Sequence, residues 1–325
     1  MHDVIEFFAQ CAQSGTLLTS LCALVLLPLA AWVACRLLTP HIVAMTDDPS
    51  WQAPLSALAA GLPGALFVGL SVRALFSDAS LACLSVPVGR GIFSLIIAIM
   101  TAALIRALWL ASQRARQVGR LIRCSAEPSQ RLQGIASACG VVSREISDSA
   151  PVCILAGTSS PVVLVSAGAL AAVSDEQLRA ALQHESAHAR RGDQLLAAAL
   201  YFLTDLLPLP AHELIETYRV ARELAADSDA ASSTDAGDLA GALLQFSKAG
   251  QALAAVSSLA DQDTVAMTKR LVALLAPSQH RGRTNTVRRV ALASALAFIA
   301  LTVFFIPVMS AQHAPSCTLV MKAGQ

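Results

Sequence analysis

A glutamate flanked by two histidines is the pattern in this 325-residue chain that most clearly predicts chemistry. His184, Glu185 and His188 form the motif His-Glu-x-x-His. Residues four apart lie on the same face of a helix, so both rings can bind one tetrahedral metal ion. Glu185 then points toward the open coordination position and can accept a proton from a water molecule there. Two surface histidines four apart by chance are disfavoured, because the chain has only 7 histidines. We therefore expect a catalytic zinc site.

A two-histidine site needs a third protein ligand, and Glu223 is the candidate that we favour. Its segment is rich in good helix formers, and Asp227 follows four residues later on the same face. Glu223 could therefore bind the metal while Asp227 accepts a hydrogen bond from the ring N–H of a ligating histidine. His212 could also act as a ligand, although it lacks the kind of hydrogen-bonding partner that Asp227 provides. Glu213 and Glu216 are interpreted as solvated residues at the start of a helix.

Local sequence patterns predict the helix and the strands that must position these residues. Ser174-Asp175-Glu176-Gln177 has the pattern of a capping box and predicts that the histidine helix begins there. Ahead of it, the apolar runs 153–157 and 162–165 are bounded by Gly, Ser and Pro, which predicts a β-hairpin. An edge strand beside the histidine helix could pair with an extended substrate backbone. A small sheet that merely covers the helix is the alternative.

The composition is that of a membrane protein. Hydrophobic residues make up 55% of the chain, charged residues make up 14%, and the mean hydropathy is +0.60. Soluble globular proteins have about 25% charged residues. The formal net charge is only +1, and no basic run interleaved with aromatic residues is present. We therefore expect a lipid bilayer as a partner and no binding of nucleic acid.

Long apolar runs predict four transmembrane helices, at about 16–38, 54–76, 92–111 and 290–310. The second run contains Pro63, which is interpreted as a kink without a function of its own. Trp109 lies where an aromatic residue of the membrane interface is expected. A model with three spans would require one of the early runs to be re-entrant.

Arginine clusters flank the region between the third and fourth runs and predict its location. The first cluster follows the third run, and the second precedes the fourth: Arg114, Arg116, Arg120 and Arg123; Arg281, Arg283, Arg288 and Arg289. By the positive-inside rule both clusters are cytoplasmic. The chain then divides into a membrane region (1–111), a cytoplasmic domain with the zinc motif (112–289), a fourth span (290–310) and a short tail (311–325). Both termini are extracytoplasmic in this interpretation.

The motifs resemble those of the BlaR/MecR-type integral-membrane zinc metallopeptidases, an antirepressor peptidase family. The resemblance rests on the His-Glu-x-x-His helix, on Arg190-Arg191-Gly192-Asp193 after it, on the apolar helix that follows, and on Glu223-x-x-x-Asp227. It is specific over residues 150–230 and extends elsewhere only through hydropathy. It implies a mainly α membrane protein with a cytoplasmic α+β, gluzincin-like peptidase domain inserted between spans three and four. It also implies Zn²⁺ bound by His184, His188 and Glu223, with Glu185 as catalytic base. Asp227 would accept a hydrogen bond from one of the ligating histidines.

The resemblance implies an endopeptidase in a bacterial cytoplasmic membrane that cleaves a protein substrate. The family's best-known members cleave a cytoplasmic transcriptional repressor after sensing an antibiotic outside the cell. Only about fifteen residues follow Ser310, with no Ser-x-x-Lys. We therefore expect no β-lactam sensing by the chain itself and a separate sensor protein instead. The alternatives are an HtpX-like quality-control protease of membrane proteins and a non-proteolytic, zinc-binding membrane adaptor.

Two further expectations concern cysteines and the oxyanion. None of the 8 cysteines forms a C-x-x-C pair, which argues against a cysteine zinc site. Cys83 and Cys317 would both lie outside the membrane, where a disulfide could join them.

Tyr218, Arg219 and Arg222 are near Glu223 in sequence, but the sequence does not show which residue stabilises the oxyanion.

Overall fold

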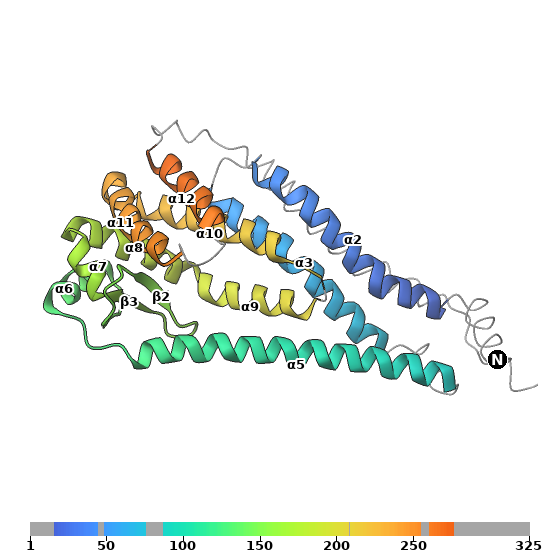
Figure 1. Ribbon diagram of the computed structural model, residues 1–325. Helices are drawn as coiled ribbons and strands as arrows, with labels where there is room; N and C mark the ends of the chain where they lie inside the picture. The colour runs from blue at the N-terminus through green and yellow to red at the C-terminus, as the bar shows by residue number, and fades with distance from the viewer. Residues whose placement is uncertain (1–15, 45–48, 76–86, 208, 255–259, 276–325) are drawn as a thin grey trace, which may run out of the picture.

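The computed structural model describes residues 16–44, 49–75, 87–207, 209–254 and 260–275 (Figure 1). The described chain is mainly helical and contains one small sheet. The predicted fourth span (290–310), the tail (311–325) and both Cys83 and Cys317 lie outside the described residues.

Three long helices occupy the N-terminal part of the chain and overlap the three predicted apolar runs. They are α2 (Thr16–Ala44), α3 (Pro49–Leu75) and α5 (Pro87–Arg123). Among the described residues, Trp51–Val72 and Ser94–Arg123 are long and apolar enough to cross a membrane, and Val25–His41 is a shorter apolar helix. The two longer segments differ in their surroundings, since 61% of the first is buried inside the protein but only 6% of the second.

A compact α+β unit follows α5 and contains the histidine helix. It comprises α6 (Gln130–Cys139), β1 (Ser143–Ile146), β2 (Cys153–Ala156), β3 (Val162–Ser166), α7 (Ala167–Ala172) and α8 (Asp175–Arg191). The strand order is β1-β3-β2, with β1 parallel and β2 antiparallel to β3. The predicted hairpin is thus present as β2 and β3, and β2 lies at an edge of the sheet. Leu132, Val163, Val165, Leu178 and Leu182 are fully buried between α6, β3 and α8.

Four helices complete the described chain: α9 (Asp193–Leu206), α10 (His212–Ala230), α11 (Ala236–Ala254) and α12 (Ala260–Leu275). α9 packs against both α5 and α3, while α10 runs along α3 and also contacts α2 and α8 (Figure 1). α11 packs against α8, and α12 packs against α10 and α11. α9 and α10 therefore form a helical hairpin that enters the space between the long N-terminal helices.

The first half of α3 serves as the core on which this hairpin packs. Ala57 and Ala60 of α3 lie in one apolar cluster with Leu200 of α9 and with Leu214 and Tyr218 of α10. Further along α3, a Cβ atom on Gly64 would lie 2.5 Å from the backbone oxygen of Leu203 in α9. Glycine is therefore required at this close approach of two helices. This helix also overlaps the second of the four predicted transmembrane runs, 54–76.

The tip of the hairpin, defined here as Asp205, Pro210 and Glu213, is tied to the helices on both sides of it. Trp32 of α2 donates its Nε1–H to the backbone oxygen of Pro210 at 2.8 Å. Arg36, also in α2, makes a forked contact with the Glu213 carboxylate, with two N···O distances of 2.7 Å.

On the α5 side, two arginines hold Asp205. Arg114 pairs with the Asp205 carboxylate at 2.6 Å and lies 5.0 Å over the ring of Tyr201. Arg106 donates to the backbone oxygen of Asp205. The tip is thus held from α2 and from α5 by aromatic and charged side chains together.

Candidate metal centre

The histidine helix α8 begins and ends at residues whose conformations its sequence dictates. Ser174 accepts a hydrogen bond from the Gln177 backbone, and the Gln177 side chain accepts one from the Ser174 backbone. This is the predicted capping box, which satisfies two N–H groups that the first turn leaves unpaired. At the other end Gly192 adopts a left-handed conformation, with φ of 67°. The chain turns there and starts α9 at the next residue.

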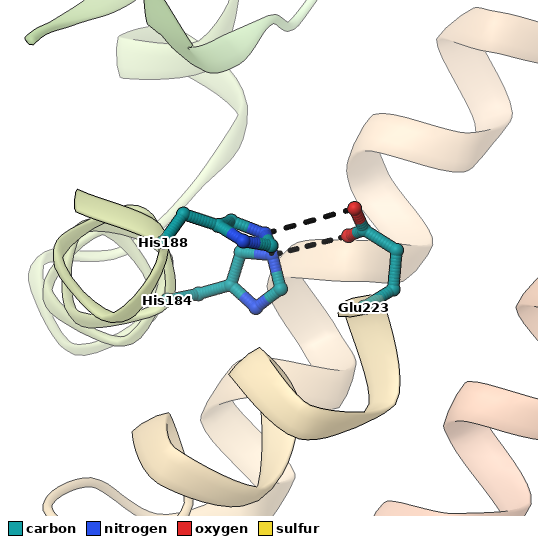
Figure 2. A group of neighbouring side chains, drawn as sticks. All are labelled: His184, His188 and Glu223. Carbon is teal, nitrogen blue, oxygen red and sulfur yellow. Dashed lines mark hydrogen bonds and ion pairs between the residues drawn. The ribbon is translucent and has the colours of Figure 1, made fainter. Parts of the chain in front are cut away.

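The structure brings His184, His188 and Glu223 together between α8 and α10 (Figure 2). The two Nε2 atoms lie 3.1 Å apart. The Glu223 carboxylate faces both rings, with Oε2 at 3.3 Å from His184 Nε2 and Oε1 at 3.6 Å from His188 Nε2. One ligand atom from each residue lies within 4.8 Å of the others, so this group could hold a metal ion.

The far side of each imidazole faces a buried carboxylate. His188 Nδ1 is 2.6 Å from Asp193 Oδ2. His184 Nδ1 is 2.9 Å from Asp227 Oδ1, a close contact rather than an aligned hydrogen bond. A carboxylate at Nδ1 places the ring proton there and leaves the Nε2 lone pair free to bind a metal. Two imidazoles oriented in this way, with one carboxylate opposite them, are a donor set suited to zinc.

Asp193 is the carboxylate to which the sequence assigned no role. It belongs to the Arg-Arg-Gly-Asp segment, and it is buried. Helical spacing could not reveal its position, because the left-handed Gly192 interrupts the helix between His188 and Asp193. The available signal was the helix-ending glycine followed at once by an acidic residue, which is a common helix start.

Arg270 of α12 is a second participant that the sequence did not reveal. Its Nε and one terminal nitrogen lie 2.7 and 2.8 Å from the two Asp227 oxygens. The other terminal nitrogen lies 3.3 Å from Glu223 Oε2. Arg222 pairs with Glu223 Oε1 at 2.8 Å. No local pattern could link Arg270 to residues more than forty positions earlier.

These contacts determine the charge states of the cluster. Burial favours a neutral imidazole at position 184, but Asp227 and Glu223 outweigh it and raise the pKa of His184 to about 9, so the ring must lose its Nε2 proton when a metal binds. Burial likewise opposes the ionised form of Glu223, yet the histidines and Arg270 hold its pKa well below the usual value. Glu223 is therefore an anion, as a metal ligand must be.

Glu185 occupies a different environment from Glu223. It is half-buried beside the histidines, and burial raises its pKa above the usual value for a glutamate. The two histidines and the Leu155 backbone N–H act in the opposite direction. A carboxylate with a raised pKa is better matched to exchanging protons near neutral pH than an ordinary glutamate.

A pocket of about 520 Å³ opens onto the cluster. Its polar lining consists mainly of the candidate site residues together with Arg222, Arg270 and Gln194. Its apolar lining comes mainly from β2, α11 and α12, with one residue of α8: Ile154, Leu155, Ala181, Leu239, Ala242, Leu243, Phe246 and Met267. The candidate site thus has an access route beside an edge strand.

The free edge of β2 is partly occupied. Val152, Ile154 and Ala156 form the backbone hydrogen bonds to β3. The backbone groups of Cys153 and Leu155, which alternate with them, therefore face outward. The Gln194 side chain donates to the Leu155 oxygen at 3.1 Å. Only the backbone groups of Cys153 are left without a partner among the described residues. Burial raises the pKa of the Cys153 thiol well above its usual value, so the side chain is neutral.

The remaining sequence candidates lie elsewhere. His212 is exposed at the start of α10, Glu213 pairs with Arg36, and Glu216 pairs with Arg219. Tyr218 is buried in the cluster on α3 and does not line the pocket. Of the three residues considered for the oxyanion, the structure brings only Arg222 to the pocket.

In comparisons with known proteins, no protein-family model and no curated protein matches the chain.

Proposed function

We propose that this protein is a membrane-embedded, zinc-dependent endopeptidase that cleaves a cytoplasmic or membrane-proximal protein. The observation that carries the proposal is the convergence of His184, His188 and Glu223 on one point, beside Glu185 and an open pocket. A purely structural metal site would need neither a half-buried glutamate beside the ligands nor access for a substrate.

In the proposed mechanism, His184, His188 and Glu223 hold the metal, and Glu185 moves the proton. Zinc, when bound, acidifies water and polarises the carbonyl of the peptide bond. Glu185 accepts the proton from the attacking water and passes it to the leaving amine. Asp193 and Asp227 keep the imidazoles in the orientation that ligation needs.

The substrate backbone is proposed to lie along β2. The outward N–H and C=O of Cys153 would pair with it, as a new strand pairs with an exposed sheet edge. Pairing at Leu155 would require Gln194 to release the backbone oxygen that it contacts. Gln194 at the Leu155 oxygen and Glu185 at the Leu155 N–H would therefore determine how far along the edge a substrate can pair.

Membrane insertion is supported by the two apolar helices and by the sequence of the fourth run. We propose four spans in a bacterial cytoplasmic membrane, with the catalytic unit in the cytoplasm and both termini outside. The basic residues at the end of α5 support this orientation. A relationship to the BlaR/MecR-type peptidases, a repressor as substrate and a separate sensor protein are parts of the same proposal, supported by the motifs in residues 150–230.

The test compares protein N-termini in cells that carry either the wild type or Glu185→Gln, together with the zinc content of both purified proteins. New termini that depend on Glu185, with equal zinc in both proteins, are the expected result. A repressor among the cleaved proteins would support signalling, while misfolded membrane proteins would support quality control. Equal zinc without any difference in termini, under conditions that activate the pathway, would favour a non-proteolytic adaptor.

A further inference from the structure

The tip of the α9–α10 hairpin marks a boundary between two kinds of surface. On one side, α2 has no charged residue from Thr16 to Cys35, and its exposed side chains there include Val25, Leu26 and Val33. α5 likewise has no charged residue from Gly91 to Ile105. On the other side, α5 carries Arg114, Arg116, Arg120 and Arg123.

The boundary itself carries the side chains that proteins place at a membrane surface. Trp32 and Arg36 of α2 lie there, with Arg36 5.3 Å over the Trp32 ring. Trp109 of α5 is 57% exposed in the same part of the helix as Arg106 and Arg114. Tryptophan and snorkelling arginine are enriched where hydrocarbon meets the headgroups.

The length of the apolar zone agrees with a bilayer. Along α5, Arg90 and Arg106 are separated by fifteen residues without a charge. Sixteen helical steps correspond to about 24 Å, and the longer stretch from Arg90 to Arg114 corresponds to about 36 Å. These lengths bracket the roughly 30 Å of a hydrocarbon core.

The metal centre lies at a fixed distance from this boundary. Glu223 at the centre follows Glu213 at the tip by ten helical steps of α10, which is about 15 Å of helix. On α9, Asp205 follows Asp193 by twelve helical steps, which is about 18 Å. The two helices thus give nearly the same distance from the tip, each measured along its own axis.

We infer that the hairpin tip lies at the inner surface of the bilayer and holds the metal centre about 15 Å beneath it. This inference rests on the proposed membrane-embedded peptidase. An extended chain advances about 3.3 Å per residue, so a membrane-anchored substrate reaches the centre with a segment that begins roughly five residues after its own span. A membrane-anchored substrate would therefore be cleaved in its cytoplasmic juxtamembrane segment, and its peptide bonds closer to the bilayer would be out of reach.

Thiol labelling of the full-length protein tests where the membrane surface lies. Leu195→Cys in α9 and Val25→Cys in α2 form a matched pair, because the native side chains are 65% and 62% exposed. His41→Cys is a second, exposed position on the cytoplasmic side of the tip. Each variant is treated with a membrane-impermeant maleimide in inside-out membrane vesicles, and the native exposed Cys124 is the internal reference.

The expected result is labelling of Leu195→Cys and His41→Cys to about the level of Cys124 and labelling of Val25→Cys lower by about tenfold, because a thiol reacts as the hydrated thiolate. Protection of both Leu195→Cys and His41→Cys, with Val25→Cys also protected, would place the hairpin inside the bilayer and overturn the inference alone. Labelling of all three positions would instead remove α2 from the bilayer and overturn the proposed membrane insertion as well.

Discussion

The metal centre and the hairpin tip are both held by arginine–carboxylate pairs, but the two sets of pairs lie in different surroundings. At the centre, the side chains of Arg270 and Asp227 are 12% and 2% exposed. At the tip, the side chains of Arg36 and Glu213 are 46% and 61% exposed, although their contact is equally short. The comparison shows that the contribution of an ion pair to stability depends more on its burial than on its contact distance. The same substitution made in both regions should therefore have unequal effects.

Replacing a glutamate by glutamine should show the largest contrast. Glu185→Gln removes the proposed proton acceptor and is expected to lower kcat by about 10²- to 10⁴-fold. Zinc content should stay unchanged, since Glu185 is not among the proposed ligands. Glu213→Gln at the tip is the matched control and should retain activity. Peptidase assays of the purified variants measure the effect, and full activity in Glu185→Gln would rule out the mechanism.

Removing an arginine should lower the free energy of unfolding more at the metal centre than at the hairpin tip. Arg270→Met leaves Asp227 buried without its forked partner and is expected to cost about 3–5 kcal/mol. Arg36→Met breaks an exposed pair and should cost at most about 1 kcal/mol. Denaturant unfolding of both variants in detergent measures the difference. Equal losses would show that the Arg270 contacts are no more important than surface pairs.

An aspartate-to-asparagine pair tests the orientation of the imidazoles. Asp193→Asn weakens the contact that fixes His188, and we expect the affinity for zinc to fall by about 10- to 100-fold. Asp205→Asn alters a carboxylate at the tip, which pairs with Arg114 far from the ligands. Its zinc affinity should match that of the wild type in a chelator competition titration. A similar decrease in both variants would mean that the loss is a general effect of destabilisation.

The smallest contrast concerns close packing rather than charge. Gly64→Ala forces a Cβ atom against the backbone oxygen of Leu203, which cannot move without α9, and should cost about 1–3 kcal/mol. Gly134→Ala in α6 meets no atom within 4 Å and should stabilise its helix by about 0.5–1 kcal/mol. Opposite shifts in thermal midpoint are expected. A neutral Gly64→Ala would mean that α3 and α9 pack less closely than described.

Local spacing predicted the parts of the molecule that depend on one element. The capping box, the shared face of His184 and His188, and the hairpin of β2 and β3 follow from turns and periodicity within short segments. Residue spacing also singled out Glu223 among four candidates, because Asp227 follows it by one helical turn. The structure places both beside His184.

Features that depend on contacts between distant elements could not be predicted from local residue spacing. Arg270 reaches Asp227 from a helix whose packing no local pattern specifies. The first half of α3 is as apolar as a membrane span, and an apolar side chain buried against α10 cannot be distinguished by composition from one in contact with lipid. The two kinds of apolar surroundings become distinct only when the partner helix is known.

Gly192 has a consequence for how the chain can change length. His188 and Asp193 contact each other across this single left-handed residue, so the number of residues between them is fixed by geometry. One inserted residue would rotate Asp193 by about 100° around the helix axis and away from the imidazole. Asp227 and Arg270, by contrast, lie 43 residues apart on two different helices, so their contact does not depend on a single helical spacing. We expect the first spacing to tolerate no insertion at all and the second to tolerate several residues.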